Sequence, residues 1–305
     1  MKNIIVVFII GCISWYGFTH VKTINAVPPI DKKVEVAFLP KETLTNSVKR
    51  TKRALVIGVG KQEDKSWTKI NGDKDVFYVQ RILGKAGYTD VHTLVNEQAT
   101  KAAVVAAFKK LTIRCVTGDI VYIHFSGHGQ QVTDTNGDEI DGWDEAWITY
   151  DAYLRYGSKD KGEKHLIDDE VNILLTGIRK KIGDSGKLLV VVDACHSGDS
   201  SRGDENEIVR GVKDEFVIPT RKIGRSAKAP ERWITLSACE DYQLNQEMAT
   251  PKVGKLTYAL YSISQKKEIT MEAIVQFMQK NRGRYPQNPI LTGETSKYKL
   301  SDFLR

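Results

Sequence analysis

The sequence predicts an α/β fold in which helices cover both faces of a mostly parallel β-sheet. Short apolar runs that end in glycine or aspartate, such as RALVIGVG (53–60) and KLLVVVD (187–193), are typical of buried strands. Between such runs lie segments whose apolar residues recur at helical spacing, as in DKDVFYVQRILGKAG (73–87). Strands and helices that alternate along a chain favour parallel pairing, because each crossover between parallel strands needs a helix.

The remaining elements follow from the same two patterns. Further strands are expected at 91–95, 119–127, 144–151 and 232–238. Further helices are expected at 100–111, where Thr100 precedes the first turn, at 168–182, and near 254–264 and 270–281. The helix at 168–182 has acids in its first turn and bases in its last, as the helix dipole prefers. A long polar loop is expected at about 199–230.

The composition is that of a folded globular protein. The chain has 305 residues, of which 41% are hydrophobic and 27% charged, which excludes an intrinsically disordered chain. Its formal net charge of +7 is dispersed and not gathered into one arginine-rich tract. We therefore expect a mildly basic monomer with no nucleic-acid partner.

The N-terminus has a composition of its own. MKNIIVVFIIGCISWYGF has one lysine followed by mostly apolar residues, so residues 1–26 are predicted to be an export signal cleaved after Ala26. Two alternatives stay open: lipidation of Cys12, and retention of the segment as a membrane anchor, although it is short for a span. The polar stretch 27–52 is interpreted as a linker or short pro-segment, and 53–305 as the folded domain. We expect an exported protein that is periplasmic, anchored to the envelope or secreted.

Two of the predicted strands are followed by residues that can react. The strand at 119–127 is followed by His128, and the strand at 187–193 is followed by Cys195. The carboxyl ends of parallel strands meet at one edge of a sheet, so the imidazole and the thiol are expected to lie together. His128 could then accept the thiol proton, and the backbone N–H groups of Gly129 and Cys195 could stabilise an oxyanion. The alternative for each residue is a structural role, which is the more common one for an isolated cysteine or histidine.

The other cysteines give no sign of a metal or disulfide framework. The chain contains no CxxC pair, which argues against a structural zinc site. Three cysteines follow the predicted signal, namely Cys115, Cys195 and Cys239, so at least one thiol stays unbridged within the chain. We interpret Cys115, Cys239 and His124 as structural.

Several segments together resemble the caspase-like cysteine peptidases, and most closely the metacaspase branch. HFSGHG (124–129) precedes DACHSG (193–198), and DGWDEAW, LIDDE, SACEDYQ and GKLTYAL are also similar to metacaspase segments. The resemblance covers about residues 53–264. It implies a caspase-like α/β/α sandwich, a His128–Cys195 dyad and no organic cofactor.

The resemblance also implies a preference for basic substrates. Metacaspases cut after arginine or lysine, and by resemblance Asp75, Ser126 and Asp193 would line the pocket. A buried pair of carboxylates is costly unless a cation satisfies it, and an arginine could do so with two parallel hydrogen bonds. The alternative for Asp75 is an acid that only suits the first turn of its helix. Proteins or peptides with basic residues are therefore the expected partners.

An acidic loop at 134–145 invites a calcium interpretation. Its spacing resembles an EF-hand loop, but Glu139 stands where the sharp turn requires glycine and a strand precedes the loop, so we reject an EF-hand. By resemblance, Asp144, Asp168 and Asp169 match positions that bind activating calcium in several metacaspases. The position of a fourth ligand is taken here by Arg202. A solvated acidic loop is the alternative.

Self-processing is the last expectation. A secreted peptidase for basic residues needs restraint before export, so we expect a zymogen that cuts itself. The polar loop offers these targets: Arg202, Arg210, Lys213, Arg221, Lys222, Arg225 and Lys228. A second basic cluster at 49–53 could release the pro-segment, and the alternative is that these bases only solvate loops. A different class of function, an inactive caspase-like interaction module, is disfavoured by the intact His128, Gly129 and Cys195.

Overall fold

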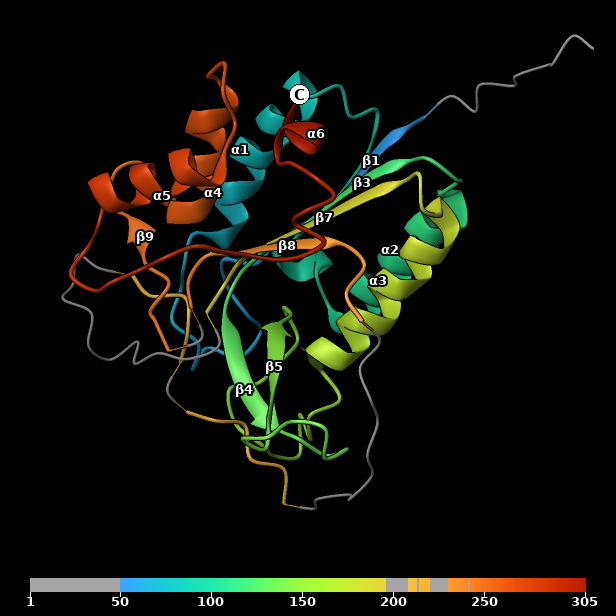
Figure 1. Ribbon diagram of the computed structural model, residues 1–305. Coiled ribbons are helices and arrows are strands. Elements are labelled where there is room, and N and C mark those ends of the chain that lie inside the picture. Colours follow the sequence, from blue (N-terminus) through green and yellow to red (C-terminus); the bar gives the residue numbers. More distant parts are fainter. Residues whose placement is uncertain (1–49, 196–207, 213, 220–229, 241) are drawn as a thin grey trace, which may run out of the picture. The chain divides into compact units, whose positions relative to one another are not determined.

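The computed structural model describes residues 50–195, 208–212, 214–219, 230–240 and 242–305 (Figure 1). The predicted signal at 1–26, nearly all of segment 27–52 and most of the loop at 199–230 lie outside these residues. No helix in the described ranges is long and apolar enough to cross a bilayer.

A six-stranded sheet lies at the centre of the domain. Its strands, in spatial order, are β11 (Ile290–Gly293), β8 (Ile234–Ser237), β7 (Lys187–Asp193), β3 (Ile120–Ser126), β1 (Lys52–Gly58) and β2 (Asp90–Val95). All neighbours pair in parallel except β11, which runs antiparallel to β8 at one edge. The predicted α/β fold with a mostly parallel sheet is confirmed, and β11 is a strand that the sequence patterns did not predict.

Helices cover both faces of this sheet, as Figure 1 shows. On one face α1 (Gly72–Lys85), α4 (Lys255–Ser264), α5 (Met271–Lys280) and the short α6 (Ser301–Leu304) share one apolar core with the sheet. On the other face α2 (Lys101–Arg114) and α3 (Asp168–Ile182) share a second core. The predicted helices agree with α1 to α5 within a few residues at each end.

A smaller antiparallel sheet lies beyond the carboxyl ends of the central strands. It consists of β4 (Gly129–Thr133), β5 (Trp143–Ile148) and β6 (His165–Ile167), of which only β5 was predicted. Two further short strands, β9 (Glu247–Met248) and β10 (Val253–Gly254), pair with each other, and a single 3₁₀ turn, η1 (Asn96–Gln98), follows β2. Irregular segments between these elements therefore gather at the carboxyl edge of the central sheet.

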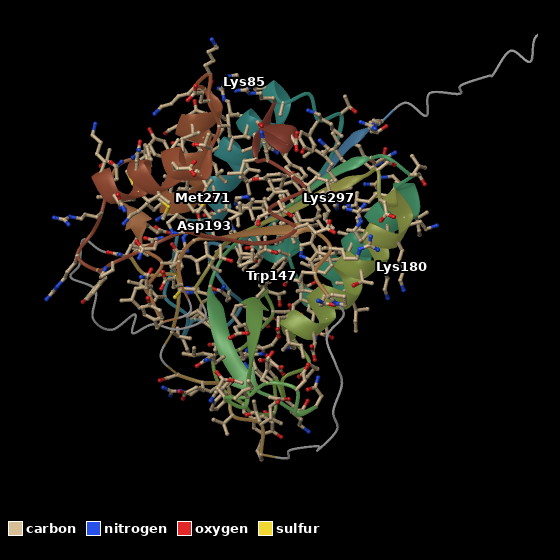
Figure 2. The ribbon with its side chains drawn as sticks, in the orientation of Figure 1. Lys85, Trp147, Lys180, Asp193, Met271 and Lys297 are labelled. Atoms are coloured by element: carbon tan, nitrogen blue, oxygen red, sulfur yellow. The ribbon has the colours of Figure 1, made fainter. Side chains whose placement is uncertain are left out.

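The register of the central strands aligns that edge. Ser126, the last residue of β3, pairs with Asp193, the last residue of β7, and with Gly58 at the end of β1. Helix α1 begins close beside it, since a Cβ atom at Gly72 would overlap the carbonyl oxygen of Ser126. Asp193 lies in the interior of the domain, where Figure 2 labels it, and is fully buried. The buried polar groups at this edge must therefore form hydrogen bonds and ion pairs with one another.

The packing of α2 on the sheet predicts that truncating Phe108 causes a large loss of stability. Phe108 is fully buried and its ring lies 6.5 Å from that of Trp147, whereas Ile113 on the same helix is 76% exposed. Phe108→Ala should lower the free energy of unfolding by about 3–5 kcal/mol, because it leaves a cavity between the helix and the sheet. Ile113→Ala is the matched control and should change it by no more than about 0.5 kcal/mol in urea denaturation. Equal losses in the two variants would contradict this packing.

Candidate active site

The two predicted reactive residues lie at the same edge of the sheet. His128 follows β3 in the turn to β4, and Cys195 follows β7 by two residues. The two turns are joined by a hydrogen bond from the Gly127 N–H to the Asp193 carbonyl oxygen at 3.4 Å. His128 is fully buried and Cys195 is 1% exposed, so the residues of this site are shielded from water.

The surroundings of His128 determine which ring nitrogen can act as a base. Its Nε2 lies 2.7 Å from the carbonyl oxygen of Thr68, which can only accept, so Nε2 carries the hydrogen. The other nitrogen, Nδ1, has no hydrogen-bond partner among the described residues. Burial lowers the pKa of His128 to about 4, although the bond to Thr68 opposes this. The ring is thus neutral near pH 7, with the lone pair on Nδ1. Neither Thr68 nor Trp67, whose ring lies 5.0 Å from the imidazole, was predicted.

The thiol of Cys195 is oriented by a backbone carbonyl. Its Sγ donates to the carbonyl oxygen of Gln243 at 2.9 Å, and the Cys239 Sγ approaches the same oxygen at 3.5 Å. The three cysteines that the structure describes form no disulfide. Cys115 lies at the end of α2, away from this edge, and burial raises its pKa to about 12. Cys115 is therefore an inert thiol, in keeping with the structural role expected of it.

The backbone N–H groups of Gly129 and Cys195 converge on one oxygen atom. Both donate to the carbonyl oxygen of Arg210, at 3.3 Å and 3.2 Å respectively. The Arg210 N–H in turn donates to the carbonyl oxygen of Asn245 at 2.9 Å, and the carbonyl of Ile208 accepts from the Glu247 N–H at 2.9 Å. The segment around Arg210 therefore runs through the site, where isolated bridges pair Val209 with Gln246 and Gly211 with Gly129. Of the basic residues expected in the polar loop, Arg210 is the one that the structure describes at this position.

The side chain of Arg210 enters a pocket formed by all three predicted pocket residues. Its Nη1 lies 2.6 Å from Asp75 Oδ2, 2.7 Å from Ser126 Oγ and 3.3 Å from Asp193 Oδ1. The Ser126 hydroxyl also donates to Asp75 Oδ2. These four side chains are fully buried. Asp75 is thus a first-turn acid of α1 whose carboxylate also contacts the Arg210 guanidinium, and its role toward a substrate stays a prediction.

A third acid, Glu247 on β9, completes the pocket and was not predicted. Arg210 Nε donates to Glu247 Oε1 at 3.0 Å, and Nη2 lies 2.9 Å from the same oxygen. Glu247 is oriented independently by Asn71, whose N–H donates to Oε1 at 2.7 Å and whose amide donates to Oε2. One sequence signal could have pointed to Glu247: it is an acid that follows the strand predicted at 232–238, whose carboxyl end lies at the same edge of the sheet.

Further groups hold the Asp193 carboxylate in place. Asn245 Nδ2 donates to Oδ1 at 2.8 Å, while the N–H and hydroxyl of Thr257 donate to Oδ2 at 2.8 Å and 2.7 Å. Gly254 forms part of the wall, because a Cβ atom there would overlap the carboxylate of Asp193 and the guanidinium of Arg210. Any residue with a side chain at 254 would therefore partly fill the pocket.

The charges of the pocket depend on one another. Burial would lower the pKa of Arg210, but Asp75, Asp193 and Glu247 outweigh burial and raise it. Burial likewise opposes ionisation of Asp193, yet the guanidinium and the bonds from Asn245 and Thr257 hold its pKa below the usual range. Asp75 differs: burial, offset in part by the guanidinium and reinforced by Asp193, raises its pKa to about 6. The guanidinium thus favours the ionised forms of Asp75 and Asp193 against the effect of burial.

The acids expected to bind calcium are only partly brought together. Two groups have carboxylate oxygens within 4.8 Å of one another: Asp134, Asp138 and Asp144; and Glu139, Asp144 and Asp168. Asp144 and Asp168 therefore lie together, whereas Asp169 belongs to neither group and accepts a hydrogen bond from Asn136. Burial, followed by the charges of Asp168 and Asp134, raises the pKa of Asp144 to about 8. Arg202, the residue at the fourth ligand position, lies outside the described residues.

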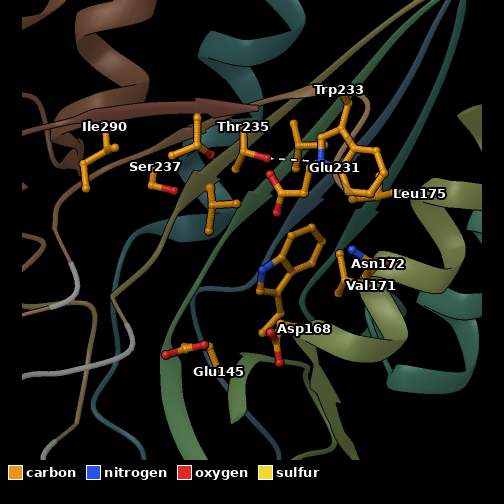
Figure 3. A pocket seen from close by; sticks show the side chains of 14 residues that line it. Glu145, Asp168, Val171, Asn172, Leu175, Glu231, Trp233, Thr235, Ser237 and Ile290 are labelled. Atoms are coloured by element: carbon orange, nitrogen blue, oxygen red, sulfur yellow. Dashed lines mark hydrogen bonds between the residues drawn. The ribbon is translucent and has the colours of Figure 1, made fainter. Parts of the chain in front are cut away.

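A separate cavity of about 360 Å³ opens between α3 and the central sheet (Figure 3). Trp147 and Trp233 line it together with Glu145, Asp168 and Glu231. The Trp233 indole N–H donates to Thr235 Oγ1 at 3.2 Å, as the dashed line in Figure 3 marks. The cavity shares Asp168 with the acidic groups and shares no lining residue with the Cys195 edge.

Comparison with known proteins gives this geometry a family. The sequence profile described as "Metacaspase, peptidase C14 domain" matches residues 52–201. Residues 52–201 belong to the metacaspase family. The metacaspase match includes both His128 and Cys195, and the metacaspase resemblance expected from the motifs is confirmed.

Individual relatives agree with the metacaspase assignment, and solved structures share the fold. "Metacaspase-2" of Arabidopsis thaliana is 31% identical over 155 residues, which are 48% of this chain and 34% of that protein. The chain spans about a third to a half of the length of the first curated relatives that it matches. A crystal structure of a Geobacter sulfurreducens protein has a TM-score of 0.59 at 23% identity, covering 84% of this chain and 97% of that one. Caspase-1 of Spodoptera frugiperda has a TM-score of 0.51 at 12% identity, covering 80% and 87%, so the caspase-like fold is shared.

The charges around Arg210 predict a pH-dependent loss of stability when the Arg210 guanidinium is removed. We consider Arg210→Ala in a Cys195→Ala background. Without the guanidinium, burial should raise the folded-state pKa values of Asp75 and Asp193 above those of the unfolded chain. Stability should then fall as pH rises through these values, by about 3 kcal/mol near pH 8 and by less near pH 5. Thermal or urea unfolding at both pH values measures this difference.

The control for this prediction is an exposed ion pair. Arg232 lies beside Asp184 at 2.5 Å, and the two side chains are 52% and 80% exposed. Arg232→Ala should have little effect at either pH, because water already solvates both charges. An equal destabilisation by Arg210→Ala at pH 5 and pH 8 would contradict the charge balance described above.

Proposed function

We propose that this chain is a cysteine endopeptidase that cleaves proteins after arginine or lysine and processes itself. The supporting observation is how Arg210 is bound: its carbonyl oxygen accepts two backbone hydrogen bonds while its guanidinium fills an acidic pocket. A peptidase holds the residue before the scissile bond in this way, because the carbonyl oxygen gains negative charge in the transition state. Membership of a peptidase family supports the same reaction class.

The residues of the edge supply each step of this reaction. His128 Nδ1 accepts the thiol proton of Cys195, and the thiolate attacks the carbonyl carbon of the basic residue. The N–H groups of Gly129 and Cys195 stabilise the resulting oxyanion. His128 then protonates the leaving amine, and water hydrolyses the thioester to restore the thiol. Because the thiol donates to Gln243 while Arg210 is bound, its hydrogen must turn toward His128 before the transfer.

The first prediction concerns the dyad and the charge of the substrate. Cys195→Ala should abolish cleavage of a fluorogenic peptide that has arginine before the scissile bond, and His128→Ala should lower kcat at least about 100-fold. Peptides with aspartate at that position should not be cleaved, because Asp75 and Asp193 would repel it. Cys115→Ala is the matched cysteine control and should retain activity. Turnover by Cys195→Ala, or equal turnover of aspartate peptides, would contradict the assignment.

Self-processing is proposed at the bond between Arg210 and Gly211. The carbonyl of that bond accepts the hydrogen bonds of Gly129 and Cys195, so the bond lies where a substrate would be cut. While it is intact, Arg210 occupies the pocket and excludes other basic residues. An enzyme that the apolar segment 1–26 directs to export would thereby remain restrained until this bond is cut.

The second prediction follows from that placement. Wild-type protein should yield a fragment whose N-terminal residue is Gly211, identified by N-terminal sequencing or intact mass, and Cys195→Ala should stay whole. Arg210→Gln should lose this cut, because a neutral amide leaves the pocket carboxylates without a cation. Arg232→Gln, at an exposed arginine, is the matched control and should be cut normally. An intact wild-type chain that is fully active would refute self-processing as the activating step.

We also propose that the acidic groups bind calcium. Carboxylate oxygens are the ligands that this ion prefers, and both oxygens of Asp138 and one of Asp144 are buried without a hydrogen-bond partner among the described residues. The donor set thus fits a divalent cation, with Asp144, Asp168 and Glu139 as the residues that would hold it. The ion would neutralise the repulsion among these acids. Asp169 would act from outside by keeping Asn136 in place.

The third prediction separates binding of calcium from activity. Millimolar calcium should raise the melting temperature of the Cys195→Ala protein, because the ion binds only the folded chain. Asp144→Asn should remove this shift, and Asp184→Asn, at an exposed acid, should not. Calcium should stimulate wild-type cleavage in the same concentration range. An unchanged melting temperature together with full activity in excess chelator would exclude the site.

A further inference from the structure

The contacts of the Arg210 guanidinium are divided between its two sides. At the floor of the pocket, Nη1 is held by Asp75, Ser126 and Asp193. On the other side, Nε donates to Glu247 Oε1 at 3.0 Å, and Nη2 lies 2.9 Å from the same oxygen, within ion-pair distance but without a hydrogen bond. The floor therefore binds the end of a cationic side chain, whereas Glu247 binds the nitrogens that lie nearer its stem.

Glu247 is also held by contacts that do not involve the guanidinium. The N–H and the amide of Asn71 bind its two carboxylate oxygens, and its backbone pairs with Gly254 between β9 and β10. Its side chain is 2% exposed with Arg210 bound. A buried carboxylate held in one orientation requires a donor at a particular place, because leaving a buried charge unpaired is costly.

Lysine cannot provide that donor. A methylene group stands where arginine has Nε, and the ammonium nitrogen stands where arginine has Cζ, one bond short of the floor. A lysine ammonium could satisfy Asp75 and Asp193 through its charge, but its stem would place CH₂ groups against the Glu247 carboxylate. Arginine satisfies both sides of the pocket at once, through its planar fork of N–H donors.

We propose that Glu247 is a specificity-determining residue that makes this pocket prefer arginine to lysine, while Asp75 and Asp193 select for positive charge in general. This inference rests on the proposed function and narrows its substrate class. The structural reason is that the two nitrogens of Arg210 that lie against Glu247, Nε and Nη2, have no counterpart in lysine.

The experiment compares two peptides that differ only in arginine or lysine before the scissile bond. Wild-type protein should give a kcat/KM ratio of arginine to lysine of about 10 to 100, the range expected for hydrogen bonds to one buried charge. Glu247→Gln should lower the arginine value at least about tenfold and change the lysine value little, and Glu247→Ala should lower the ratio further. Glu268 is an exposed glutamate outside the pocket, so Glu268→Gln is the control and should keep the wild-type ratio.

A second measurement works within one molecule and needs no added peptide. Arg210→Lys should slow the cut before Gly211 about 10- to 100-fold when Glu247 is present. In the Glu247→Gln background the same substitution should slow it by only a few-fold, and the difference between the two ratios is the coupling of the two residues. Equal slowing in both backgrounds would overturn the inference.

The outcomes distinguish this inference from the function on which it rests. If wild type cleaves neither peptide, the proposed function fails. If it cleaves both and the ratio is the same in Glu247→Gln, only the inference about Glu247 fails. Should the Glu247 variants not fold, inhibition of wild-type turnover by propylguanidine and by butylamine decides the question: stronger inhibition by the guanidine supports it, and equal inhibition overturns it.

Discussion

Three carboxylates lie buried around one guanidinium, and the geometry of the whole carboxyl edge depends on that cation. Asp75 comes from α1, Asp193 from the end of β7 and Glu247 from β9, so the pocket joins elements far apart in the chain. Buried ion pairs add little stability by themselves, because desolvation offsets most of the attraction. What they do supply is selectivity: without a cation of the right shape the three acids repel one another. Under the proposed function, another basic side chain could therefore replace Arg210 in the pocket, and an acidic or neutral one could not.

The same interaction would serve the proposed self-processing. Arg210 binds the pocket acids and places its carbonyl oxygen against the N–H groups of Gly129 and Cys195, so the proposed restrained state would also be ready for the reaction. Cutting the following bond would leave Arg210 at a chain end, held by the pocket alone. Since a substrate arginine would offer the same contacts, binding of substrate would become a competition between equals. The restraint in the intact chain would therefore come from the covalent attachment of Arg210 on both sides, which raises its local concentration at the pocket, and not from tighter contacts.

The acidic groups near β5 and α3 are arranged differently. Carboxylate oxygens of Asp134, Asp138, Asp144 and Asp168 gather in two groups that share Asp144. Burial, followed by the charges of Asp168 and Asp134, raises the pKa of Asp144. A pocket that binds one arginine side chain and a cluster of neighbouring acids are thus two electrostatic arrangements in one domain. The first suits a site that exchanges one side chain for another, and the second suits an ion that comes and goes with its concentration.

The sequence by itself determined the fold class and the placement of His128 and Cys195 at one edge of the sheet, because apolar periodicity defines parallel strands and their carboxyl ends share an edge. The motifs also identified Asp75, Ser126 and Asp193, which lie at strand or helix ends where local pattern is informative. Only the tertiary structure decided which basic residue of the polar loop enters the pocket, and that Glu247 and Thr68 take part. Thr68 and Arg210 lie in irregular segments and Glu247 in a two-residue strand, where neither periodicity nor motif specifies a position. Thr68 reaches His128, and Arg210 reaches Glu247, through long-range contacts that only the packed chain creates. For the same reason the sequence grouped Asp169 with Asp144 and Asp168, whereas packing directs its carboxylate to Asn136.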